Sequence, residues 1–281
     1  MSDEVLTLEQ RRKLQEQVLV KHHLANILTH WFNVAMWLLL LPTGIGILLE
    51  KTYPASSTAW NDLMRQIFGS TASLIYWHGV WGQIWLAVLT FNIFIGFRKY
   101  FLTFASTRML LDKDDIRWLM IKPWHMLGLR KHVPLPPQDA YNAGQKLYSY
   151  VVVVGSFWIG LTGMIMVYSE HIPTSWQWVI QWAMPIHFLA VGITFSGVII
   201  HVYMGAIFPE ERQAFFSMFT GKVNGLYAYL HHRKWYLRKM AEKAAWEAEY
   251  RRRYREPAQV EASSTATARP GAAPAEAPGG D

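Results

Sequence analysis

Four long stretches of this chain carry almost no charged side chains, and each is long enough to cross a lipid bilayer. They run from about 28 to 49, 74 to 97, 147 to 168 and 183 to 208. About 20 apolar residues span the hydrocarbon core as a helix. At that depth only helices and closed barrels satisfy their own backbone hydrogen bonds. The sequence therefore predicts an all-α integral membrane protein, a four-helix bundle embedded in a lipid bilayer.

Basic residues are distributed unevenly around the four stretches. Of the 27 Lys and Arg residues, 25 lie in the N-terminal segment, the 98–146 loop and the C-terminal tail, and only Lys51 and Arg65 lie on the other side. Lys and Arg accumulate on the cytoplasmic side of membrane proteins. We therefore expect both termini to be cytoplasmic. The net charge of +7 is then a topology signal, and we expect no nucleic-acid partner.

The rest of the chain divides around this membrane domain, residues 28–208. Residues 1–27 are expected to form a cytoplasmic segment with a short amphipathic helix, and residues 209–256 a cytoplasmic helical extension. Residues 257–281 are rich in Pro, Ala, Gly, Ser and Thr, a composition typical of disorder. The segment 174–182 holds three Trp, which favours a position at the membrane interface opposite the termini.

Cysteine is absent from the chain, and this restricts its redox chemistry. Iron–sulfur clusters need Cys thiolates, and covalent c-type haem attachment needs a Cys-x-x-Cys-His run. Any redox centre held by this chain must therefore use His or Met.

Four of the 11 His residues lie within the apolar stretches: His30, His78, His187 and His201. Ionisable side chains are costly inside a bilayer, so each is a functional candidate. His187 and His201 are 14 residues apart on one helix, which is roughly 21 Å along its axis and about 40° short of four full turns. Both imidazoles are therefore expected on one side of that helix, near opposite membrane faces.

The depths of the four His residues suggest two pairs. The alternating direction of the helices places His78 at the outer level with His187, and His30 at the cytoplasmic level with His201. Four-helix bundles hold cofactors between facing helices, and His is a common axial ligand of haem iron. The pattern predicts two b-type haems, with the four His as iron ligands. The alternatives are four unrelated His bonded to neighbouring helices, or zinc, which prefers four ligands.

Several short motifs give the chain a resemblance to a known family. It resembles the cytochrome b (gamma) subunit of membrane-bound formate dehydrogenases over about residues 30–236. The matching pieces are Thr29–Trp31, His78–Gly79, Asp112–Leu119, Tyr141–Lys146, Ile186–His187, His201–Met204, Gly221–Val223, His231–His232 and Trp235–Tyr236. The Tyr-Asn-Ala-Gly-Gln-Lys run is the most specific of these.

The resemblance implies a dihaem protein of the bacterial inner membrane that passes electrons to menaquinone. It places the quinone beside the cytoplasmic-side haem, bound by Asn142, Gly144, Gln145 and the haem ligand His201. Side-chain amides at the start of the third helix can bond a quinone carbonyl, and glycine lets a flat ring approach the backbone. The alternative role of Asn142 is that of a helix N-cap only.

The resemblance also implies the partners of this chain. They are an iron–sulfur subunit at the outer face and a catalytic subunit that holds molybdenum or tungsten, so this chain does not itself oxidise the primary substrate. Two other functions remain open. One is the cytochrome b subunit of a [NiFe] hydrogenase or another respiratory oxidoreductase, and the other is a haem-free membrane transporter or scaffold.

Overall fold

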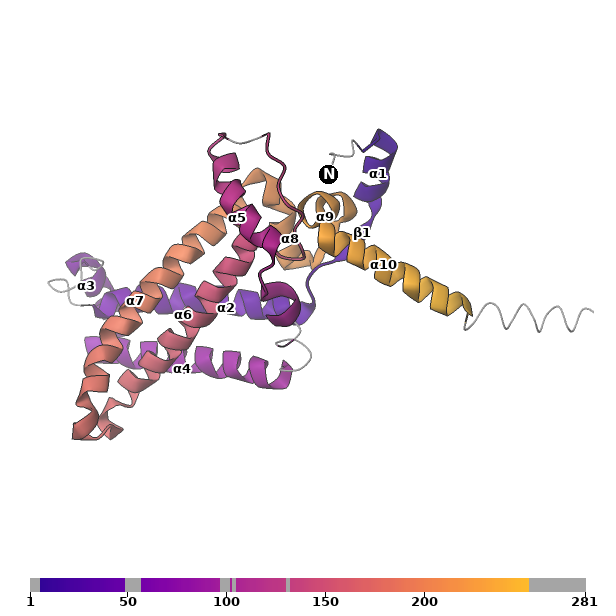
Figure 1. The fold of residues 1–281 in the computed structure, drawn as a ribbon. Coiled ribbons are helices and arrows are strands. Elements are labelled where there is room, and N and C mark those ends of the chain that lie inside the picture. The colour runs from indigo at the N-terminus through magenta and orange to yellow at the C-terminus, as the bar shows by residue number, and fades with distance from the viewer. Residues whose placement is uncertain (1–5, 49–56, 97–101, 103–104, 130–131, 253–281) are drawn as a thin grey trace, which may run out of the picture.

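The computed structural model describes residues 6–48, 57–96, 102, 105–129 and 132–252. The 257–281 tail, expected to be disordered, lies outside these residues. Figure 1 shows a mostly helical chain. Its elements are α1 (Leu8–Glu16), β1 (Val18–Val20), α2 (Leu24–Ile47), α3 (Thr58–Phe68), α4 (Thr71–Gly96), the π-helix η2 (Ala105–Met109), α5 (Lys113–Met126), α6 (Ala143–Val167), η3 (Ser169–His171), η4 (Thr174–Trp176), α7 (Gln177–Val202), the π-helix η5 (Tyr203–Ile207), η6 (Pro209–Glu211), α8 (Arg212–Thr220), β2 (Lys222–Asn224), α9 (Gly225–His231) and α10 (Arg233–Tyr250).

The described residues include four helices long and apolar enough to cross a membrane: α2, α4, α6 and α7. This confirms the expected all-α membrane architecture. Each helix begins earlier than hydropathy indicated, and α7 begins at Gln177 rather than near 183. The second half of the Trp-rich segment is therefore helical. Hydropathy marks the apolar part of a helix, whereas its backbone begins at a cap or turn that can be polar.

Many large apolar side chains on these four helices are exposed. Leu38 on α2 is 70% exposed and Phe94 on α4 is 77% exposed. A soluble protein buries most side chains of this kind and rarely leaves large contiguous apolar patches open to water. On helices of membrane length, these side chains provide the surface that contacts lipid.

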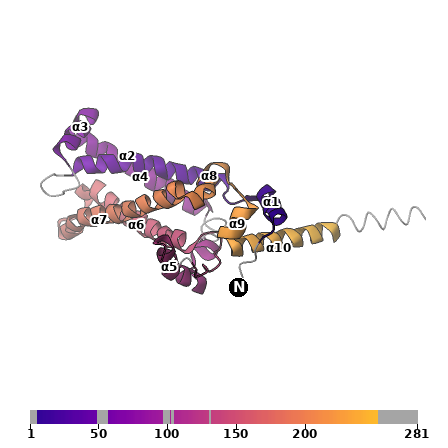
Figure 2. The same cartoon turned by 90° about the horizontal axis from the view of Figure 1, so that it is seen from above.

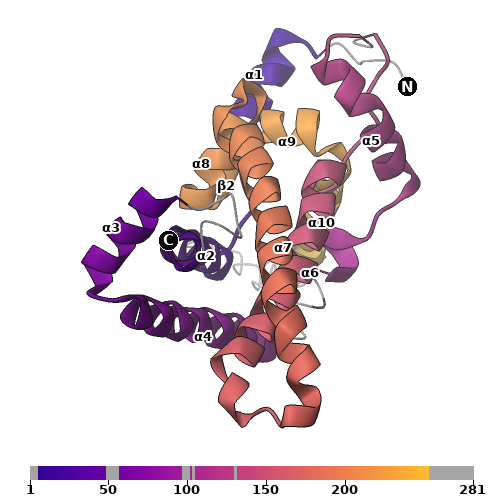
Figure 3. The same cartoon turned by 90° about the vertical axis from the view of Figure 1, so that its left-hand side faces the viewer.

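The four helices form two side-by-side pairs, α2 with α4 and α6 with α7. Figure 2 shows both pairs running between two opposite ends of the bundle, and Figure 3, which looks nearly along α2, shows α6 and α7 side by side and crossing the direction of α2. Helix α3 and the turn between α6 and α7 lie at one end, which we call the α3 end. Helices α1, α5, α9 and α10 lie at the other, which we call the α9 end. The N-terminal and C-terminal segments therefore meet at the same end of the bundle.

A two-stranded antiparallel sheet joins these two segments. Strand β1 pairs with β2, with Leu19 opposite Val223. Next to the sheet, Gly221 ends α8 with a φ of 72° and accepts backbone hydrogen bonds from Lys21 and His22. A Cβ at Gly221 would lie 2.6 Å from the His22 carbonyl oxygen. Glycine is therefore required both by the left-handed backbone conformation and by the close approach.

A small apolar core lies at the α9 end, outside the membrane-length helices. It consists of Ala140, Val223, Tyr227, Ala228 and Trp235. These residues come from the segment before α6, from β2, from α9 and from α10. The C-terminal extension thus packs on the segment that leads into α6, and this packing holds the start of α6 in place.

Candidate functional site

The two imidazoles predicted for the outer level lie on α4 and α7. His78 and His187 are close enough to interact electrostatically, and both are half-buried. A threonine from a neighbouring helix contacts each ring. Thr43 Oγ1 of α2 lies 2.9 Å from His78 Nδ1, and Thr162 Oγ1 of α6 lies 3.0 Å from His187 Nδ1. All four helices therefore contribute to this level of the bundle.

The other two imidazoles lie toward the α9 end, on α2 and α7. The ring centroids of His30 and His201 are 6.3 Å apart. Two metal–imidazole bonds of about 2 Å, plus roughly 1 Å from each nitrogen to its ring centre, give about 6 Å. The separation of this pair would therefore suit two imidazoles that hold one haem iron between them.

The surroundings of His30 and His201 also fit a bound cofactor. His30 Nδ1 is buried without a hydrogen-bond partner among the described residues, whereas His201 is exposed. An exposed imidazole on a membrane-length helix needs a polar or metal partner. The ring of Tyr148 on α6 stacks on His201, with centroids 4.8 Å apart and planes 15° apart. Sequence reasoning missed Tyr148, although it follows the 141–146 motif by only two residues.

Glycines lie beside His78 and His187, and one turn after His78 and His201. An added Cβ at Gly44 would lie 3.2 Å from His78 Cε1, and one at Gly163 would lie 3.5 Å from His187 Cε1. One turn after His78 and His201, an added Cβ at Gly82 or Gly205 would meet no atom within 4 Å. Small residues at these positions leave room for a bulky planar group. No group of three or more His, Cys, Asp or Glu that could hold a metal ion is present among the described residues.

Asn142 and Gln145 form a capping box at the start of α6. Asn142 caps α6, and its Oδ1 accepts a hydrogen bond from the Gln145 backbone N–H at 2.9 Å. Gln145 Oε1 in turn accepts from the Asn142 backbone N–H at 3.0 Å. This capping box occupies the side-chain oxygens. The amide NH2 groups of both residues remain as donors, so a role as cap does not compete with binding of a carbonyl ligand.

Gly144 lies within the same turn. An added Cβ there would lie 3.4 Å from Asn142 Oδ1 and 3.5 Å from the ring of Trp118 on α5. The indole therefore borders the backbone at Gly144. Gln145 and Tyr148 are three residues apart on α6, so they share one face of the helix. Tyr148, which stacks on the ring of His201, therefore links the face of α6 that carries Gln145 to this imidazole.

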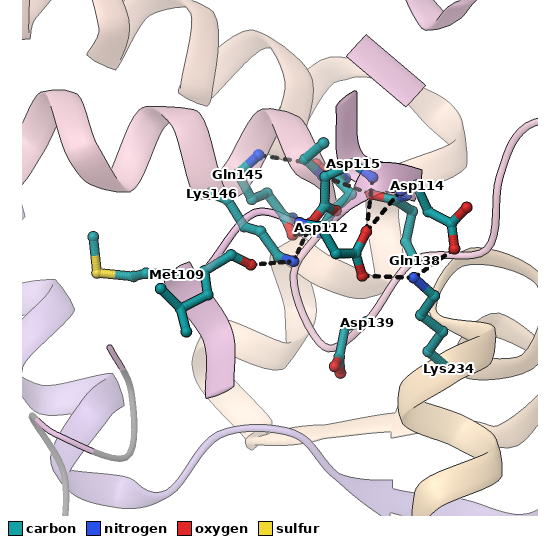
Figure 4. Close-up of polar contacts among 12 residues, drawn as sticks. Met109, Asp112, Asp114, Asp115, Gln138, Asp139, Gln145, Lys146 and Lys234 are labelled. Carbon is teal, nitrogen blue, oxygen red and sulfur yellow. Dashed lines mark hydrogen bonds and ion pairs between the residues drawn. The ribbon is translucent and has the colours of Figure 1, made fainter. Parts of the chain in front are cut away.

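A buried ion pair fixes this turn against α5 (Figure 4). Lys146 Nζ lies 2.6 Å from Asp115 Oδ2, and both side chains are at most 3% exposed. Lys146 also donates to the Leu110 carbonyl, and Asp115 accepts from the Asp112 backbone N–H. Outside this pair, Lys234 of α10 contacts Asp112 at 2.7 Å. The start of α6 is therefore attached to α5, and through α5 to α10.

A second buried polar cluster at the α9 end was not predicted from the sequence. Lys21 Nζ lies 2.8 Å from His232 Nε2, and His232 Nδ1 lies 2.6 Å from the Asp139 carbonyl. Burial lowers the pKa of Lys21 to about 8, and burial together with the Lys21 charge holds the pKa of His232 well below its usual range. A neutral His232 accepts from Lys21 and donates to Asp139. These bonds tie the N-terminal segment to the junction of α9 and α10, where His232 lies, and to the segment before α6.

Glu211 lies in the same cluster. Its carboxylate accepts a hydrogen bond from the Tyr227 hydroxyl at 2.5 Å and contacts His231 Nδ1 at 3.7 Å. Burial raises the pKa of Glu211, but the contacts with His231 and Tyr227 outweigh it and lower the pKa to about 2. The carboxylate is therefore a structural anion at neutral pH.

Four membrane-length helices that bring paired imidazoles together, with no metal-holding group of three or more His, Cys, Asp or Glu among the described residues, are typical of a membrane cytochrome b. The chain belongs to the prokaryotic cytochrome b561 family, which it matches over residues 21–221. Similar proteins include the cytochrome b556(Fdn) subunit of nitrate-inducible formate dehydrogenase from Escherichia coli (strain K12), and those from Escherichia coli O157:H7 and Shigella flexneri. Each is 25% identical over 223 residues, which cover 78% of this chain and 91% of the relative.

These similarities confirm the family resemblance that the sequence motifs indicated. The chain is a multi-pass membrane cytochrome b with a role in electron transfer, and its family membership implies haem b. The number of haems, their ligands, the quinone and the side of the termini stay predictions.

Proposed function

We propose that this chain is the membrane anchor and electron-transfer subunit of a respiratory formate dehydrogenase. It receives electrons from an iron–sulfur partner subunit at the α3 end and passes them through two b haems to menaquinone near the α9 end. Formate is oxidised on a separate subunit that holds molybdenum or tungsten. The name of the E. coli relative, a formate dehydrogenase cytochrome b556 subunit, supports this choice of complex.

The observation that carries the proposal is the placement of four imidazoles at two levels. His78 and His187 would hold the haem at the α3 end, and His30 and His201 the haem nearer the α9 end. The spacing of His187 and His201 on α7 separates the two levels by roughly 21 Å. Each haem supplies a one-electron ferric/ferrous couple. The protein fixes the two ligands on different helices and keeps water away.

The quinone site is proposed at the start of α6, with Asn142, Gly144, Gln145 and His201. The amide NH2 groups of Asn142 and Gln145 remain available to donate to a quinone carbonyl. Tyr148 places this face of α6 against the His201 ring. Menaquinone would take up two electrons from the haem level and two protons from the aqueous side at the α9 end, and leave as menaquinol.

The direction of the chain in the membrane follows from its charges. We place both termini in the cytoplasm, because the basic residues concentrate in the segments that lie at the α9 end of the bundle, which include α1 and α10. The proposed setting is the bacterial inner membrane, with the iron–sulfur subunit docked on the opposite face. Electrons then move inward while protons are consumed inside, which contributes to a proton-motive force.

The identity of the partner subunits tests the proposal. A tagged chain extracted in mild detergent should co-purify with an iron–sulfur subunit and a molybdenum- or tungsten-containing subunit, and the complex should reduce a menaquinone analogue with formate. Co-purification with a [NiFe] hydrogenase subunit would replace formate dehydrogenase by hydrogenase. Absence of a Soret band would instead favour a haem-free transporter or scaffold.

A further inference from the structure

The sequence Thr-Gly occurs on α2 and again on α6, and both copies contact a proposed haem ligand. Thr43 bonds to His78 Nδ1 and Thr162 to His187 Nδ1, at 2.9 and 3.0 Å. Both threonines are buried, at 4% and 2% exposed. The glycine that follows each threonine lies against Cε1 of the same imidazole. Two unrelated helices thus build the same support for the two His residues at the α3 end.

The direction of these hydrogen bonds follows from the backbone. Thr43 Oγ1 lies 2.8 Å from the Leu39 carbonyl, and Thr162 Oγ1 lies 2.5 Å from the Trp158 carbonyl, each one turn back. A hydroxyl has one proton, and these carbonyls can only accept it. The oxygen of each threonine is then left to accept from the imidazole. His78 and His187 therefore carry their proton on Nδ1 and present Nε2 as a free ligand.

The other pair of imidazoles has no such support. Among the described residues, His30 Nδ1 is buried without a partner. The described contact of His201 with Tyr148 is ring stacking, with no hydrogen bond to the imidazole. The two levels therefore differ in the groups around the ligands, although both present two imidazoles.

We propose that Thr43 and Thr162 are positioning residues that make the haem at the α3 end the more reducing of the two. An acceptor on Nδ1–H raises the basicity of a ligating imidazole. A more basic ligand favours ferric over ferrous iron and lowers the reduction potential, since hydrogen bonding around the ligands tunes haem. Electron transfer from the α3 end toward Asn142 is then downhill. The inference rests on the proposed haem ligands.

Redox titration of the purified chain, followed by the α bands of its two haems, tests this inference. Thr43→Val and Thr162→Val keep the shape of the side chain and remove the acceptor. We expect the potential of the α3-end haem to rise by about 59 mV in Thr43→Val, which corresponds to a tenfold change for a one-electron couple. The shift in Thr162→Val should be smaller, because His187 can also bond to the Ile159 carbonyl.

Two further variants separate positioning from general packing. Thr43→Ser restores the hydroxyl and should restore the potential. Thr194→Val is a matched control, because Thr194 is buried and bonds to the Ala190 carbonyl one turn back, with no His on its hydroxyl. It should leave both potentials unchanged. Loss of the α3-end haem in Thr43→Val, with both haems kept in Thr43→Ser and Thr194→Val, would support the positioning role of Thr43, and the potential would then be tested in Thr162→Val.

Other results would overturn it. The inference is contradicted if both valine variants keep two haems at unchanged potentials, or if the potential that shifts is that of the haem held by His30 and His201. Either result leaves the dihaem proposal intact and removes the role of the threonines. A wild-type chain without two haems would instead contradict the proposed function itself, so the two failures are distinguishable.

Discussion

The ring of Tyr148 lies almost parallel to the imidazole of His201, with centroids 4.8 Å apart. Gly197 makes this stacking possible, because a Cβ there would lie 2.9 Å from Tyr148 Cε2. Tyr148 follows Gln145 by one helical turn. The stacked pair therefore connects the proposed quinone site on α6 with the proposed haem ligand on α7.

Replacing Tyr148 tests this connection. Tyr148→Leu should loosen the His201 ring, because an aromatic pair contributes about 1 kcal/mol, a factor of about five in an equilibrium constant. We expect weaker retention of the haem at this level and slower reduction of a menaquinone analogue. The measurements are haem content after washing and quinol formation by dithionite-reduced protein. Tyr148→Phe keeps the stack and should behave like wild type; equal losses in both variants would contradict a stacking role.

Changing Asn142 to Asp separates capping from quinone binding. Aspartate caps a helix as well as asparagine does, but it has no N–H to donate to a carbonyl. We expect quinone reduction to fall at least about tenfold, a loss of about 1.4 kcal/mol in binding or transition-state stabilisation, while haem content and the melting temperature stay unchanged.

Gln145→Glu provides the companion experiment at the other residue of the capping box. Glutamate also completes a capping box, and it too lacks the amide donor. The same loss of quinone reduction is expected. Wild-type rates in both variants would show that the two residues act as a cap only.

The ion pair of Lys146 with Asp115 predicts a large effect on stability. Removing one member of a buried pair leaves an uncompensated charge, which costs about 3–5 kcal/mol. We therefore expect Asp115→Asn to lower the melting temperature in detergent markedly. Asp114→Asn is the control, because Asp114 pairs with Lys234 in a more exposed position. Similar melting temperatures for the two variants would show that the buried pair does not stabilise the start of α6.

Stability should also depend on pH through Glu211. Its pKa is lowered from 4.5 to about 2, mainly by His231 and Tyr227 against the effect of burial. A carboxylate with a depressed pKa stabilises the folded state fully above the unfolded pKa, and this contribution is lost as pH falls from about 4.5 to 2. The loss amounts to about 3 kcal/mol. Glu211→Gln should be less stable at pH 7 and should lose less stability on acidification; parallel pH profiles would contradict this role.

Much of the architecture was predictable because its signals are local. Hydropathy over about 20 residues identifies a membrane-length helix, and helix geometry alone relates His187 to His201. The starts of the helices were less predictable. Asn142 and Gln145 form a polar capping box at the start of α6. Hydropathy detects only apolar residues, so it places the start of this helix too late.

The contacts that complete the site were not predictable, because they join distant parts of the chain. Thr43 reaches His78 from another helix, 35 residues away, and Lys21 reaches His232 across 211 residues. No local pattern marks such partners. The pairing of β1 with β2 was missed for the same reason, since three-residue strands carry little signal of their own.

The haem content of the purified chain tests the central claim most directly. A reduced-minus-oxidised spectrum, combined with haem quantification, should show two low-spin b haems per wild-type chain. His78→Ala and His201→Ala should each lose one haem, with different bands remaining in the two variants. Absence of a b-type α band from the wild-type chain, or two haems retained in both variants, would contradict the account.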